Sequence, residues 1–139
     1  MTKRLASAWL LTYQYLAGLG DTTTGLLLVF APLWTMTLMG VQRLPQPIEY
    51  VSFVGVFVLG VGLAYLSVTR LPLTAQNTPR WQTVWILTAL IRSLVAAFLL
   101  TEILSGQMEP AWFTVAIVDG ALAVIQWIGL GKGWLNFEG

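Results

Sequence analysis

The chain has 139 residues, of which 57% are hydrophobic and only 9% are charged, with a formal net charge of +1. Such a composition, with a mean hydropathy of +0.76, leaves too few charged side chains for the surface of a soluble domain and indicates an integral membrane protein. The sequence has no cysteine or histidine, which excludes disulfides and thiolate or imidazole ligands for haem or metal. A net charge of only +1 offers no basic patch for nucleic acid.

The first hydrophobic region runs from residue 5 to residue 41. It is too long for one crossing, because about 20 apolar residues span a bilayer. Pro32 cannot continue a helix, so the region divides there. We expect a spanning helix over 8–30 and a short helix over 33–40 that lies at the membrane interface.

An alternative reading moves the first crossing to 23–41 and brings Asp21 close to a membrane surface. Tryptophan is enriched at both interfaces of a membrane protein. The crossing over 8–30 places Trp9 and Trp34 at opposite interfaces, as an aromatic belt requires. We therefore favour the crossing that leaves Asp21 near mid-membrane.

Three further hydrophobic segments are each long enough to cross a bilayer: 48–68, 81–104 and 110–130. With the first crossing they predict an all-α protein whose single domain, residues 1–139, is an antiparallel bundle of four transmembrane helices. The second crossing carries glycines where another helix can approach closely: Gly55, Gly60 and Gly62. We expect this helix at the centre of the bundle, and we interpret the seven tryptophans as aromatic belts.

The basic residues predict the orientation of the bundle. If both termini share one side, that side holds most of the basic residues: Lys3, Arg4, Arg70, Arg80 and Lys132. The loops on the opposite side hold only Arg43. Because short cytoplasmic loops carry an excess of Lys and Arg, we expect both termini to be cytoplasmic, in a bacterial inner membrane.

Three charged residues interrupt the crossings: Asp21, Arg92 and Asp119. Arg92 lies 14 residues before Gly106 in the last turn, and Asp119 lies 13 residues after it. In an antiparallel hairpin both therefore lie roughly 20 Å from the turn and can meet. Asp21 falls at a similar depth, so the three form one layer. Helical spacing places supporting polar side chains on the same faces: Gln14, Thr88 and Gln126.

This layer has two interpretations. In the structural one, Arg92 bridges both carboxylates and locks the bundle. In the functional one, Asp21 or Asp119 takes up a proton or binds a cation in a dry setting. No nucleotide-binding, catalytic-triad or metal-site motif is present, so the sequence predicts no catalytic residue and no metal site.

The chain resembles the small DoxX-like four-helix membrane proteins in its size and in its glycine-rich second crossing. It also resembles them in two stretches of sequence: Asp-Thr-Thr-Thr-Gly-Leu-Leu-Leu-Val-Phe-Ala-Pro at 21–32 and Leu-Ile-Arg at 90–92. That resemblance implies a membrane subunit beside a redox partner and transfers no catalytic residue.

We therefore expect a non-catalytic accessory subunit of a respiratory or photosynthetic electron-transfer complex. It would pack on a redox-active core subunit within the lipid bilayer and help to hold lipid, quinone or pigment. The alternative is a small proton-coupled carrier that works as an oligomer around Asp21, Arg92 and Asp119.

Overall fold

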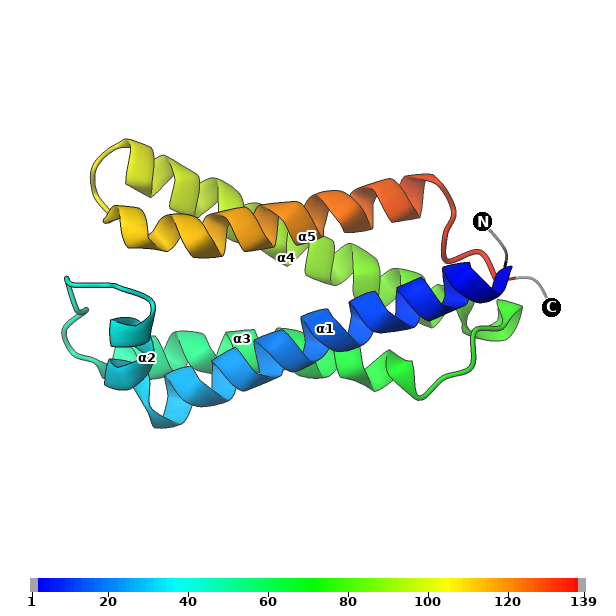
Figure 1. Cartoon of the computed structure of the whole chain (residues 1–139), viewed down its shortest axis with the longest axis horizontal. Coiled ribbons are helices and arrows are strands. Elements are labelled where there is room, and N and C mark those ends of the chain that lie inside the picture. The colour runs from blue at the N-terminus through cyan, green and yellow to red at the C-terminus, as the bar shows by residue number, and fades with distance from the viewer. Residues whose placement is uncertain (1–2, 138–139) are drawn as a thin grey trace.

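The computed structural model describes residues 3–137, and this part of the chain consists of helices without any strand. The elements follow the order α1 (Lys3–Phe30), α2 (Pro32–Leu38), α3 (Glu49–Thr69), η1 (Ala75–Asn77), α4 (Thr78–Leu104), η2 (Pro110–Trp112) and α5 (Phe113–Gly131). The long helices α1, α3, α4 and α5 alternate in direction along an elongated bundle (Figure 1). Both termini lie at one end of the bundle, and α2 lies at the other.

Within residues 3–137, three segments are long and apolar enough to cross a membrane: Glu49–Thr69, Ala75–Leu104 and Pro110–Gly131. They correspond to the predicted second, third and fourth crossings, although α4 begins at Thr78 instead of residue 81. α1 also begins earlier than predicted, and the sequence around Gln14 and Asp21 makes it the most polar of the long helices. Its role as a crossing stays a prediction.

The predicted break after the first long helix is confirmed. Pro32 occupies the first turn of α2, where its missing N–H is tolerated. The short helix ends at Leu38, two residues before the predicted end, because Gly40 takes a φ of +78° and closes the turn. Met36 is fully buried, so one face of α2 is anchored on the bundle while Trp34 is exposed. Its location at a membrane interface stays a prediction.

α1 packs chiefly on α3, and glycine permits the close approach of the two backbones. A Cβ atom on Gly55 would lie 2.7 Å from a side-chain carbon of α1. A Cβ on Gly62 would lie 2.9 Å from the carbonyl oxygen of Gly18. From the α1 side, a Cβ on Gly25 would lie 2.6 Å from a backbone carbon of α3. Glycines on both helices therefore set the distance between the α1 and α3 backbones. Those on α1, Gly18 and Gly25, were not identified from the sequence.

Two predictions about α3 are wrong. The first concerns Gly60, where a Cβ would meet no atom within 4 Å. Gly60 lies two residues before Gly62, which is about 200° around the helix axis, so it is on the opposite face of α3. α3 also does not occupy the bundle centre. It packs on α1 and less extensively on α4, and it leaves Phe53, Val54 and Phe57 exposed.

The two halves of the bundle differ in their cores. At the end that holds the termini, a shared core joins the long helices: Leu10, Tyr13, Ala17, Tyr65, Val68, Trp81, Trp85 and Leu135. Trp81 and Trp85 are fully buried, so the prediction that they belong to an aromatic belt is wrong. In the other half the buried residues form two clusters, and Trp112 packs against both of them. Leu28 and Val51 pack between α1 and α3, whereas Leu99 packs with α5.

Candidate functional site

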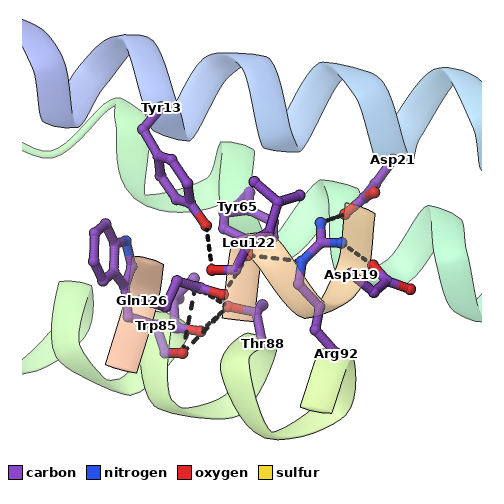
Figure 2. Close-up of polar contacts among 10 residues, drawn as sticks. Tyr13, Asp21, Tyr65, Trp85, Thr88, Arg92, Asp119, Leu122 and Gln126 are labelled. Atoms are coloured by element: carbon purple, nitrogen blue, oxygen red, sulfur yellow. Dashed lines mark hydrogen bonds and ion pairs between the residues drawn. The ribbon is translucent and has the colours of Figure 1, made fainter. Parts of the chain in front are cut away.

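The guanidinium group of Arg92 lies in the middle of the bundle and is bonded to the other three long helices (Figure 2). Its side chain comes from α4 and is almost completely buried. Nη1 donates to Asp119 on α5, and Nη2 donates to Asp21 on α1. Nε donates to the hydroxyl oxygen of Tyr65 on α3 at 3.1 Å. The predicted contact of Arg92 with both carboxylates is confirmed.

An arginine is the residue that suits this position. Its planar guanidinium presents N–H donors in a rigid fork, so it can hold two carboxylates and a hydroxyl at once, which a lysine ammonium cannot do in the same plane. The carbon at the centre of the guanidinium also lies 5.4 Å from the centroid of the Tyr65 ring, within cation–π range. The two aspartates and Arg92 carry a formal charge of −1.

The three charged side chains differ in exposure. The side chain of Arg92 is 4% exposed, whereas those of Asp21 and Asp119 are 20% and 17% exposed. Each carboxylate accepts a bond from Arg92 through one oxygen, and within residues 3–137 its second oxygen has no hydrogen bond. The arginine is therefore enclosed, and the outer edges of the carboxylates are the accessible part of the cluster.

Tyr65 connects the charges to a buried polar seam. It is fully buried, accepts the bond from Arg92 and donates its own proton to Gln126 Oε1 at 2.9 Å. Sequence reasoning missed this residue. The signal that could have found it is its position three residues after Gly62, on the face of α3 that packs against the bundle.

The predicted polar neighbours are all fully buried and lie between the cluster and the end of the bundle that holds the termini. Gln126 Nε2 donates to Thr88 Oγ1 at 2.7 Å. Gln14 Nε2 donates to the carbonyl oxygen of Tyr65 at 2.9 Å, and its Oε1 accepts from Trp85 Nε1 at 2.8 Å. Gln14 thus joins the seam through Tyr65 and Trp85, and the two glutamines satisfy polar groups that burial would otherwise leave unpaired.

The arrangement can hold helices together and can present two carboxylate edges, but it contains no nucleophile beside a base. In the part of the chain that the structure describes, no group of three or more acidic, cysteine or histidine side chains could hold a metal ion. Hydrogen bonds to buried charges are strong, and removal of one partner leaves the other unpaired. The geometry links α4 to the three other long helices through hydrogen bonds inside the bundle.

Comparisons with known proteins return no relative: no family model, no curated protein and no solved structure matches this chain. The fold and the site therefore define its class. Three segments apolar enough to cross a membrane indicate a helical integral membrane protein that contacts lipid, with a charged cluster inside its bundle. The resemblance to DoxX-like proteins stays a proposal.

Proposed function

We propose that this protein is a non-catalytic integral membrane subunit that packs beside the redox-active subunits of an electron-transfer complex. The observation that carries the non-catalytic role is that each of the three guanidinium nitrogens of Arg92 donates a hydrogen bond, to Asp21, Asp119 or Tyr65. A side chain bonded in this way on three sides is suited to holding helices together. Such a cluster needs no transported or reacting species to account for its residues.

The proposal includes α1 as a fourth crossing. α1 runs alongside α3 (Figure 1) and brings Asp21 to the depth of Arg92 and Asp119. α1 contributes Asp21 to the charge cluster and packs closely on α3, which is long and apolar enough to span a membrane. We therefore place α1 beside α3 in the bilayer. The short helix α2 then lies at one interface. The termini, with the basic residues beside them, lie at the cytoplasmic face of a bacterial inner membrane.

The outer surface supports a partner in the membrane. α3 exposes Phe53 and Phe57, whose ring centroids are 5.0 Å apart, and α4 exposes Leu94 and Phe98. These apolar faces suit lipid chains or the helices of a neighbouring subunit. Because this chain supplies no cysteine or histidine, haem or iron–sulfur centres would belong to the partner, with only peripheral contacts to lipid, quinone or pigment here. The similarity to DoxX-like proteins points the same way.

The test is extraction of the tagged protein from its native membrane in mild detergent, with an untagged strain as the control. Native gel separation, mass spectrometry and an absorption spectrum of the same band identify what travels with it. We expect coloured, redox-active membrane subunits at constant stoichiometry. A colourless band that contains this chain alone would refute the accessory-subunit proposal.

A proton-coupled carrier is the second candidate, and the partial exposure of Asp21 and Asp119 favours it. In that case Asp119→Asn would leave a folded, abundant protein that no longer moves protons in reconstituted vesicles. Glu49→Gln, at the start of α3 and outside the cluster, is the matched control and would keep transport. If Asp119→Asn lowers abundance without a separate transport defect, the carrier loses its support.

A further inference from the structure

Two surface grooves flank the last turns of α3, and each is bounded by one arginine. The first has a volume of about 500 Å³ and is walled by Val68, Leu71 and Val84, with Arg80 at its edge. The second has a volume of about 670 Å³ and is walled by Leu19, Leu63 and Leu66, with Arg70 at its edge. Ser67 borders both grooves, so they lie on either side of the same helix end.

The serine and threonine hydroxyls in these walls are already bonded to backbone carbonyls, and Tyr15 adds one phenolic hydroxyl to the second groove. Ser67 donates to the carbonyl of Ala64 at 2.7 Å, and Thr69 and Thr83 each donate to a carbonyl of their own helix at 2.8 Å. The walls therefore behave as apolar surface. Both arginines are exposed, and among residues 3–137 no carboxylate pairs with either. The charged donors that remain free are thus the two guanidinium groups.

The arginines mark the membrane surface. Arg70 directly follows α3, Arg80 lies in the first turn of α4, and both helices are long and apolar enough to span a bilayer. From Arg70 the second groove runs back along α3 to Leu63, a distance of about 10 Å along the helix axis. A molecule that fits this end would place an anionic group at the surface and apolar chains below it.

We propose that the grooves bind an anionic phospholipid, with its phosphate at Arg70 and Arg80 and its acyl chains in the two grooves. Charge complementarity selects the occupant, because basic residues at the end of a membrane span attract acidic lipid headgroups. A zwitterionic lipid carries a cation beside its phosphate that opposes the two arginines. The inference deepens the lipid-holding part of the proposed function and rests on its placement of this end at a membrane surface, while it requires no redox partner.

The experiment is native mass spectrometry of the purified, delipidated chain titrated with phosphatidylglycerol or with phosphatidylcholine of the same acyl chains. We expect phosphatidylglycerol to bind more tightly, by roughly five-fold for each arginine. The double variant Arg70→Gln, Arg80→Gln should lose that preference. Arg43→Gln, an exposed arginine at the opposite end of the bundle, is the matched control and should keep it.

A second variant tests the grooves without touching the arginines. Ser67→Trp places a large ring between the two grooves, so it should weaken binding of phosphatidylglycerol while the helical circular dichroism spectrum is retained. Equal affinity of the unaltered protein for both lipids would overturn the proposal, as would an equal loss in Arg43→Gln. Full competition by the soluble headgroup glycerophosphoglycerol would also overturn it, because it would show an anion site without a role for acyl chains.

The outcomes separate this inference from the accessory-subunit proposal. A colourless homo-oligomer that still prefers phosphatidylglycerol would reject the redox partner and keep the lipid site. A coloured complex whose subunit shows no lipid preference would do the reverse.

Discussion

Replacement of Arg92 by methionine is the sharpest test of the charge cluster as a tie between helices. Arg92→Met keeps an unbranched side chain of similar length and removes the guanidinium. The variant leaves Asp21 and Asp119 facing each other inside the bundle without a counter-charge, and it leaves the Tyr65 hydroxyl without its donor. The protein should fold less stably because the carboxylates lose their partner, and not because the core loses volume.

The magnitude follows from the burial of the three charges. Removal of one partner of a buried ion pair costs about 3–5 kcal/mol. The carboxylates are 20% and 17% exposed, but near mid-membrane their outer edges would face lipid and not water, so the loss should fall within this range. The triple variant Arg92→Met, Asp21→Leu, Asp119→Leu removes every charge of the cluster. It should recover most of that loss, because an apolar replacement of a whole buried ion cluster is often neutral.

The assay is reversible unfolding in mixed micelles with increasing dodecyl sulfate, followed by circular dichroism, which gives the free energy of unfolding of each variant. Arg43→Met is the control: this arginine is exposed in the loop after α2, outside the cluster and both grooves, and its loss should change the free energy by less than about 0.5 kcal/mol. The reasoning is refuted if Arg92→Met is as stable as the unaltered protein, or if the triple variant is no more stable than Arg92→Met.

Three further predictions concern contacts around the cluster. Gly62→Ala should destabilise the protein by about 1–3 kcal/mol, because its Cβ would press on the backbone of α1, whereas Gly60→Ala meets open space and should cost nothing in the same unfolding assay. Tyr65→Phe should lower the free energy of unfolding by about 1–3 kcal/mol, since it leaves Arg92 Nε and Gln126 Oε1 unpaired. An unchanged free energy of unfolding would contradict this. The Glu109 carboxylate accepts hydrogen bonds from the backbone amides of Gln42 and Arg43 at 2.8 and 2.9 Å. Glu109→Ala should lose about 1 kcal/mol there and speed hydrogen exchange of these two amides by roughly five-fold. Unchanged exchange would show that the contact does not hold the loop.

The charge cluster was predictable because charges are rare in apolar helices and a short turn fixes depth. Residues counted from Gly106 placed Arg92 and Asp119 at one level, and the structure pairs them. The break at Pro32 was predictable for a similar local reason, since proline removes a backbone donor at a defined position. Depth along a helix and the ends of helices can thus be read from single residues.

Rotation about the helix axis was not predictable in the same way. A membrane helix is apolar on all sides, so hydrophobic periodicity does not distinguish its inward face from its lipid face. Helical spacing puts Gly60 and Gly62 on opposite faces, but the pattern does not say which of them faces α1. In the same way, Trp81 and Trp85 were assigned to an interface although they are fully buried. Tyr65 was missed for the same reason, because its role in the cluster depends on its side chain pointing into the bundle.

The location of Arg92 explains why a costly charge is kept inside the bundle. Toward the termini the long helices share one core, and just beyond Arg92 the α1–α3 and α4–α5 pairs have separate cores. The apolar packing between the pairs therefore weakens at the level of the cluster, and the bonds of the guanidinium supply a directional contact there. At the far end, Trp112 packs against both cores, and Glu109 accepts hydrogen bonds from the backbone amides of Gln42 and Arg43, so the two residues provide a second link. Between these two links the pairs rely least on each other, so a neighbouring subunit or lipid that contacts both pairs would contribute most to their association in this half of the bundle.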